Sequence, residues 1–175
     1  MFIRVKSRIN SKGEIKKYAY LVRSVRRKRS KKHPKQKVVA YLGRVIELNN
    51  NLQQSTTPNL KTLRANLKPM FKELVVSNGF KETSKDSFLR GNIYINTQRS
   101  VVKDVKTGQN ICLKVNEGYI SSYSISKLMN YRPIESVEKE VGRDFAKKLV
   151  SSGLKPSQEV FMALYLLISK KFHRK

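Results

Sequence analysis

The first 48 residues alternate between apolar and polar positions with the two-residue period of a β-strand. Residues 2–9 (FIRVKSRI) place apolar side chains on one face and Arg4, Lys6 and Arg8 on the other. Residues 15–25 (IKKYAYLVRSV) and 37–48 (KVVAYLGRVIEL) are predicted as the next strands, and the turn NSKG joins the first two. Because consecutive strands with short connections usually pair antiparallel, we expect a three-stranded antiparallel meander.

A helical period follows a polar linker. Residues 49–57 form the linker, and Thr57 and Pro58 have the residue types of a helix start. Apolar residues then recur at helical spacing up to Gly79, which can end the helix. Pro69 lies inside this pattern, so we expect the helix to kink or split there. The periodic apolar residues are Leu60, Leu63, Leu67, Met70, Phe71 and Leu74.

The pattern of the second half mixes both periods. Residues 101–115 predict a β-hairpin that turns at Gly108, and residues 121–131 are read as helical. A helix capped by Ser136 is expected to stop at Gly153, and Pro156 or Ser157 opens a final helix.

These patterns predict an α+β fold. An N-terminal three-stranded antiparallel sheet with a basic loop precedes a kinked helix, a β-hairpin and two C-terminal helices. The expected division is a basic β module at residues 1–48, a linker at 49–57 and an α+β region at 58–175.

The net charge of the chain limits the kinds of partner that it can bind. The chain has 38 Lys and Arg against 12 Asp and Glu, a formal net charge of +26. Such an excess repels itself unless a polyanion shares the surface, so nucleic acid is the leading partner and an anionic membrane surface the second. The first 44 residues contain 16 cations and a single acid, Glu14.

The densest cation run lies between two predicted strands. Eight of the twelve residues 26–37 are Lys or Arg. A solvated loop that only aids solubility is the ordinary explanation, but the flanking strands favour a loop presented to phosphates. Arg26, Arg27 and Arg29 are the first choices within it, because a guanidinium donates in a fixed fork. The predicted nucleic-acid-binding residues are Arg4, Lys6, Arg8, Lys16, Lys17, Arg23, Arg26, Arg27, Lys28, Arg29, Lys31, Lys32, Lys35, Lys37 and Arg44, with a secondary patch at Lys170, Lys171, Arg174 and Lys175.

Tyr18, Tyr20 and Tyr41 lie among these cations. They could stack on exposed bases, but tyrosine is an ordinary strand residue, and we expect them to pack the sheet against a helix.

The residues predict no catalytic centre, metal site or cofactor. Cys112, the single cysteine, is expected to be a buried small hydrophobe. His33 and His173 have no acid nearby in sequence, and Asp86, Asp104 and Asp144 are not expected to form a two-metal cluster.

The longest apolar run, from Val160 to Ile168, is too short to cross a bilayer. We expect a core helix there, with pairing to a partner protein or a second copy as the alternative. With no signal-like segment, the expectation is a soluble intracellular protein without a transmembrane segment.

Short motifs in the predicted strands resemble the N-terminal β region of insertion-sequence DDE transposases. The matching residues are Phe2 to Arg4, Tyr20 to Val22, Arg26, and Tyr41 to Arg44, within the first 45 or so residues. The resemblance implies contact with DNA. It does not imply transposition, because we do not expect that family's long RNase-H-like catalytic domain in the remainder.

The sequence therefore predicts a non-catalytic protein that binds duplex DNA, mostly through phosphates, with its N-terminal sheet and loop. An RNA- or ribosome-associated protein is the first alternative, and an accessory or degenerate nucleic-acid-processing enzyme is the second. The expected location is cytoplasmic, on the nucleoid or the ribosome.

Overall fold

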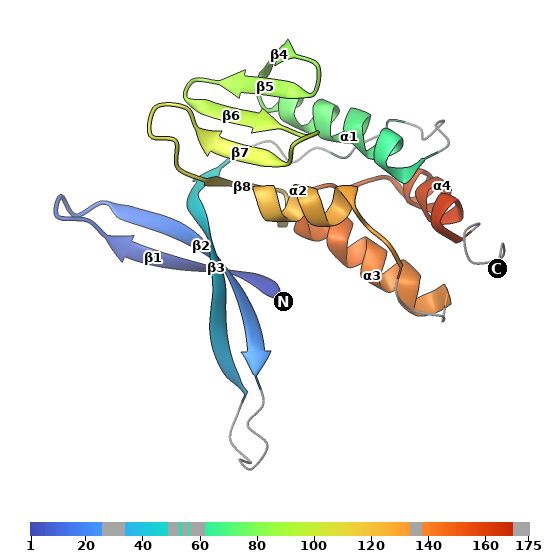
Figure 1. Cartoon of the computed structure of the whole chain (residues 1–175), viewed down its shortest axis with the longest axis horizontal. Helices are drawn as coiled ribbons and strands as arrows, with labels where there is room; N and C mark the ends of the chain where they lie inside the picture. Colours follow the sequence, from blue (N-terminus) through green and yellow to red (C-terminus); the bar gives the residue numbers. More distant parts are fainter. Residues whose placement is uncertain (26–33, 49–52, 54–55, 57–61, 134–137, 170–175) are drawn as a thin grey trace.

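The computed structural model describes residues 1–25, 34–48, 53, 56, 62–133 and 138–169 (Figure 1). The predicted α+β class is confirmed, because helices and two sheets are both present. One sheet has the strand order β1-β2-β3-β8-β9, and the other has the order β4-β5-β6-β7. The first three strands form arms that project from a body of helices and the smaller sheet.

The predicted N-terminal meander is confirmed. Its strands are β1 (Phe2–Ile9), β2 (Ile15–Val25) and β3 (Lys35–Glu47), and both neighbouring pairs are antiparallel. The turn between β1 and β2 is closed by Asn10, whose side-chain oxygen accepts from the backbone N–H groups of Lys12 at 3.0 Å and Glu14 at 2.8 Å. A polar side chain that replaces lost backbone partners is a common way to stabilise such a turn.

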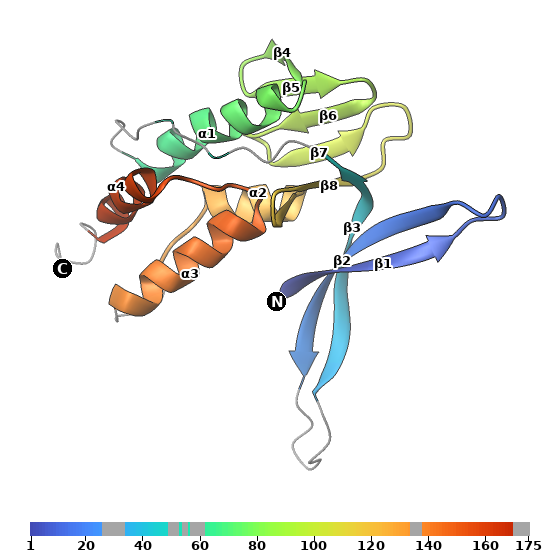
Figure 2. The ribbon, with the colours of Figure 1, turned by 180° about the vertical axis from the view of Figure 1, so that it is seen from behind.

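The two hairpins of the meander diverge from a shared centre. Only residues 18–22 of β2 pair with both β1 and β3; we call this three-stranded part the hub. The β1–β2 hairpin beyond it, residues 7–17, is the first arm. The β2–β3 ribbon beyond it, with described residues 23–25 and 35–37, is the second arm. Figures 1 and 2 show the arms pointing in different directions, and two register shifts between β2 and β3 fall within the hub, where bulges increase strand twist.

β3 connects the arms to the body. Its last residues pair in parallel with β8 (Ile111–Val115), which in turn pairs antiparallel with β9 (Gly118–Ile120). Gly43 lies at the junction with φ +124°, and a Cβ there would lie 2.2 Å from the backbone oxygen of Asn110. Only glycine allows this approach of the two backbones.

The predicted hairpin at residues 101–115 is wrong. β7 (Val101–Asp104) pairs with β6 (Ile93–Asn96), while β8 joins the other sheet. A single bridge between Lys103 and Asn110 links the two segments. The turn at Gly108 does form, but parallel pairing with β3 takes β8 away from β7. The strands that sequence analysis missed are β4 (Lys81–Ser84), β5 (Ser87–Arg90) and β9.

The predicted helix after the linker is α1 (Leu63–Ser77), but its start differs from the prediction. The N-cap is Thr62, whose hydroxyl accepts from the backbone N–H of Ala65 at 3.2 Å. Thr57 is therefore not the cap of α1; it lies, with Pro58 and Leu60, outside the described residues. Pro69 sits inside one continuous helix and does not split it. Gly79 follows the C-cap with positive φ, as predicted.

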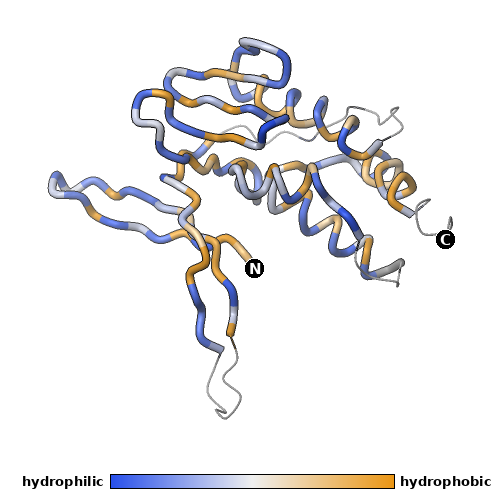
Figure 3. Tube along the Cα trace, viewed as in Figure 1, coloured by the Kyte–Doolittle hydropathy of each residue, from blue (hydrophilic) through white to orange (hydrophobic). Residues whose placement is uncertain are grey.

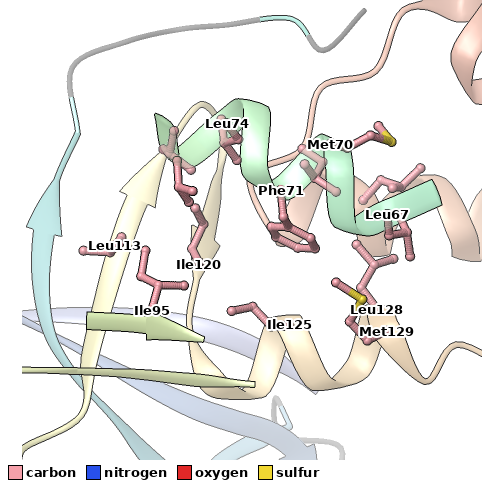
Figure 4. Packing of buried hydrophobic residues seen from close by; sticks show 14 of the residues in the cluster. Leu67, Met70, Phe71, Leu74, Ile95, Leu113, Ile120, Ile125, Leu128 and Met129 are labelled. Atoms are coloured by element: carbon pink, nitrogen blue, oxygen red, sulfur yellow. The ribbon is translucent and has the colours of Figure 1, made fainter. Parts of the chain in front are cut away.

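Three further helices complete the body: α2 (Ser122–Met129), α3 (Glu138–Ser151) and α4 (Gln158–Ser169). Ser157 opens α4, since its hydroxyl accepts from the N–H of Val160 at 3.3 Å. The predicted cap of α3, Ser136, lies outside the described residues. The main core forms where the buried face of α1 meets both sheets and α2; Figure 4 labels Leu67, Met70, Phe71, Leu74, Ile95, Leu113, Ile120, Ile125, Leu128 and Met129.

The apolar segment between Val160 and Ile168 belongs to α4. Val160, Leu164 and Ile168 are buried in the main core, whereas Met162 is 48% and Leu166 52% exposed. The expected core helix is therefore buried on one face, and pairing with a partner through the other face stays a prediction. None of the described helices is long and apolar enough to span a membrane.

Candidate nucleic-acid interface

One face of the hub and of the adjoining first arm carries a row of cations. Direct cross-strand partners have their side chains on the same face of a sheet, and the register pairs Arg4 with Tyr20, Lys6 with Tyr18 and Arg8 with Lys16. On the other side of β2, Arg44 is the partner of Tyr18. Five of the predicted residues therefore share one surface, which we call the cationic face: Arg4, Lys6, Arg8, Lys16 and Arg44.

Most cations of this face are free of acidic partners. Arg4 donates from its guanidinium to the side-chain oxygen of Gln36, a neutral group on β3 that orients it. Lys16 lies 3.8 Å from Glu14 at the turn of the first arm. Among the described residues, no carboxylate forms an ion pair with Arg4, Lys6, Arg8 or Arg44. Their charge is thus available to an external anion.

A second group of predicted cations lies on the opposite face. Arg23 pairs across the sheet with Lys37, and Val25 pairs with Lys35, so the described cations of the second arm, Arg23, Lys35 and Lys37, share the face opposite the cationic face. Lys17 donates to Glu47 at 2.8 Å, and Lys114 lies 3.9 Å from the same carboxylate. The hydrogen bond from Lys17 holds the pKa of Glu47 below its ordinary value, and Glu47 raises the pKa of Lys17 in return. Of the predicted cations, Lys17 is thus partly neutralised.

The remaining predicted cations lie outside the described residues. These are the loop residues Arg26, Arg27, Lys28, Arg29, Lys31 and Lys32, and the secondary patch Lys170, Lys171, Arg174 and Lys175. The described residues on either side of the loop, Val25 and Lys35, pair with each other across the two strands. Figure 3 shows the outer parts of both arms mainly in hydrophilic colours.

The three tyrosines lie on the cationic face, and the expectation that they pack the sheet against a helix is wrong. Ala19 and Leu21, on the alternate positions of β2, turn toward the body and form a small apolar cluster with Leu42, Val45 and Cys112. Tyr18, Tyr20 and Tyr41 belong to neither apolar cluster, and Tyr41 is 44% exposed. Lys6 Nζ lies 5.5 Å from the ring centroid of Tyr20, and the Arg8 guanidinium lies 5.9 Å from that of Tyr18.

A groove of about 570 Å³ separates the start of β1 from α2 and α3. Phe2 and Tyr123 contribute to its lining, and so do Lys148 and Asp144, which form an ion pair with each other at 2.5 Å. Two carboxylates, Glu117 and Asp144, face this groove, so it does not continue the row of unpaired cations Arg4, Lys6 and Arg8.

The aspartates considered as possible metal ligands take part in different local interactions. Asp86 forms an ion pair with Lys68 at 2.6 Å, and Asp104 accepts from the backbone N–H groups of Lys106 and Thr107 in the turn after β7. Within the described ranges, no group of three or more His, Cys, Asp or Glu could hold a metal ion. His33 and His173 lie outside those ranges.

Cys112 is fully buried, as predicted. It lies in the apolar cluster between the hub and the body, and burial raises the pKa of its thiol to about 12. A thiol held protonated in an apolar cluster is a packing group and not a nucleophile.

A twisted antiparallel sheet with an acid-free row of cations and projecting basic arms is typical of nucleic-acid-binding modules. Comparison with known families agrees with this class: residues 3–73 match the family model described as IS1634 family transposase, N-terminal domain. The match spans β1 to β3 and most of α1, so it extends beyond the resemblance in the strand motifs. It indicates a DNA-binding role in a transposase context.

Neither the curated proteins nor the solved structures contain a match to this chain. Residues 74–175, which include the smaller sheet and α2 to α4, lie outside the family match.

Proposed function

We propose that this chain is a non-catalytic protein that binds duplex DNA, and that the cationic face and the two arms make mostly phosphate contacts. The observation that carries the proposal is the row Arg4, Lys6 and Arg8 on β1, exposed, on one face and without a described carboxylate partner. The transposase-type N-terminal match favours DNA over RNA as the polyanion. Association with the nucleoid follows from this proposal.

The strand geometry suits a phosphate backbone. Alternate residues of a strand are about 6.7 Å apart, so β1 presents a cation at each such step. One strand of DNA offers a phosphate about every 3.4 Å along the axis, and the cation spacing is on the scale of two such steps. Strand β1 thus presents a fixed row of charge, which costs less entropy to position than a flexible tail does.

The shape and charge of the second arm fit a groove of DNA and its phosphates. A two-stranded ribbon fits the major groove of DNA, and Arg23 and Lys37 carry charge on the face opposite the cationic face. Lys35 lies on that face with Arg23 and Lys37, so all three can contact phosphates along one side of the ribbon. The cationic face and the second arm are therefore proposed as two phosphate-binding surfaces on opposite faces of the meander.

The proposed lack of catalysis is supported by the positions of the acids. Phosphoryl-transfer sites that use two metal ions gather carboxylates within a few ångströms of each other. Asp86, Asp104 and Asp144 instead stabilise separate parts of the body, by ion pairs or by a turn.

The test is a salt titration of DNA binding. Affinity for a 20-base-pair duplex is measured by fluorescence anisotropy over a series of KCl concentrations, for the wild type and for the triple variant Arg4→Ala, Lys6→Ala, Arg8→Ala. Each phosphate that is no longer neutralised reduces the slope of log affinity against log salt by about 0.9, so the triple variant is expected to lower it by about 2.7.

The matched control removes the same charge from the body. Lys81, Lys85 and Lys106 are exposed on the smaller sheet and its turns, and none forms an ion pair with a described residue. Replacing all three with Ala should leave the slope unchanged. Equal losses of slope in both triple variants would show that net charge alone drives binding, and the interface would be wrong. A hairpin RNA of equal length that binds more than tenfold tighter than the duplex would assign the chain to RNA instead.

A further inference from the structure

The tyrosines of the hub form a cluster in which the rings touch one another. The ring centroids of Tyr20 and Tyr41 are 5.5 Å apart, and those of Tyr18 and Tyr41 are 6.3 Å apart, with interplanar angles of 50° and 43°. These are favourable tilted arrangements. Tyr41 is the central ring, and the other two hold it from the side of β2.

The ring of Tyr41 differs from those of Tyr18 and Tyr20 because no described cation covers its face. Lys6 lies over the ring of Tyr20, and Arg8 lies over that of Tyr18, whereas no described cation lies at such a distance over Tyr41. Tyr18 and Tyr20 are half-buried, while Tyr41 is 44% exposed. The cluster therefore has one open ring, supported on its edges and surrounded by positive charge.

The phenol of Tyr41 also stays neutral. Desolvation raises its pKa, and so do Tyr18 and Tyr20, although the nearby Arg8 acts in the opposite direction. A phenolate would repel the phosphates that the surrounding cations attract. A neutral ring beside cations instead has the composition of the platforms on which proteins stack nucleobases.

We propose that Tyr41, held by Tyr18 and Tyr20, is a stacking site for an unpaired base of the DNA bound on the cationic face. This inference rests on the proposed function and specifies its substrate. A base inside a duplex has both faces covered by its neighbours, so only a base in a bubble, a bulge, an end or a single strand can stack on the ring. Arg4 and Arg44, on either side of the cluster, hold the flanking phosphates.

The substrate is thus DNA whose pairing is locally open. Stacking of one base on an aromatic side chain changes affinity by about tenfold. The wild type is therefore expected to bind a duplex with a three-nucleotide bubble about tenfold tighter than a fully paired duplex of the same length. A 2-aminopurine placed in the bubble reports stacking directly, because its fluorescence is quenched when it stacks on a ring.

Three variants separate stacking from its alternatives. Tyr41→Leu keeps bulk and removes the ring, so it should lose both the tenfold preference and the quenching while paired-duplex affinity stays. Tyr41→Phe keeps the ring and should retain both. Val38→Ala alters another exposed position of the same face and should also retain both. Circular dichroism melts check that each variant folds. The 2-aminopurine quenching measured with the wild-type protein tests stacking even if a variant does not fold.

Each outcome decides the inference. If Tyr41→Phe loses as much as Tyr41→Leu, the contact is a hydroxyl hydrogen bond, and stacking is wrong. If the wild type binds both duplexes equally, or Tyr41→Leu keeps the preference and the quenching, the inference fails while duplex binding through phosphates stands. If the wild type binds neither DNA, the proposed function fails and the stacking site fails with it.

Discussion

Gly43 and Asn110 bring the backbones of the arms and the body into direct contact. A Cβ at Gly43 would lie 2.2 Å from the carbonyl oxygen of Asn110 and 2.8 Å from the backbone nitrogen of Ile111. Real Cβ atoms do not approach backbone atoms this closely, so any side chain would push β3 away from β8. The orientation of the cationic face relative to the body thus depends on one missing methyl group.

Replacing Gly43 with Ala is expected to lower the free energy of unfolding by more than about 2 kcal/mol, because strained φ and steric overlap add. The measurement is urea unfolding followed by circular dichroism. Gly13→Ala is the matched control: its φ is +79°, but nothing lies within 4 Å of the added Cβ, so it carries the strain alone. Equal losses of stability in the two variants would contradict the close approach.

Cys112 should report the contact between the hub and the body. Its thiol is buried and has a pKa raised to about 12, so it should not react with a thiol reagent at pH 8 in the native protein. In urea, the reaction is expected to become at least about a hundredfold faster, since the pKa returns to its ordinary value near 8.5. Equal rates in the two conditions would place Cys112 at the surface.

The ion pair between Lys17 and Glu47 gives stability a pH dependence. Its hydrogen bond lowers the pKa of Glu47 in the folded state, so the contribution is present above the ordinary pKa and is lost as pH falls through the folded-state value. Wild type should exceed Glu47→Gln in stability at neutral pH, and the gap should close in acid. Thermal melts of both proteins at pH 7 and pH 3 test this, and a gap that is constant with pH would disprove it.

The basic loop of the second arm is expected to bind further phosphates beside those held by the cationic face. Replacing Arg26, Arg27, Lys28 and Arg29 with Ala should flatten the salt dependence of duplex binding, by about 0.9 for each phosphate that the variant no longer binds. The slope is measured by anisotropy, with the body-lysine triple variant as reference. An unchanged affinity and slope would remove the loop from the interface.

The sequence predicted what local pattern can specify. The strands of the arms and the buried face of α1 follow from periods of two and 3.6, because Leu67, Phe71 and Leu74 need only their own helix to share a face. The partner of β8 could not be predicted this way. The turn at Gly108 suits a hairpin with β7, and only the three-dimensional position of β3 shows that Ile111 pairs with Arg44 instead.

The face of the sheet on which the tyrosines lie could be predicted from the sequence only in part. Tyr18 and Tyr20 alternate with buried Ala19 and Leu21, so strand parity alone could have placed them beside Lys6 and Arg4. Tyr41 could not be placed by parity. It shares a face with Gln36 and Arg44, at positions of opposite parity, because the register shifts between β2 and β3 change which side each β3 residue takes.

The parallel pairing of β3 with β8 also sets an order for folding during synthesis. The meander consists of neighbouring segments, so its hairpins and its cations can form as soon as the first residues leave the ribosome. The apolar side chains of Ala19, Leu21 and Leu42 then stay uncovered until Cys112, which completes their cluster, has been synthesised. For that interval the nascent chain exposes a charged surface on one side and a hydrophobic surface on the other.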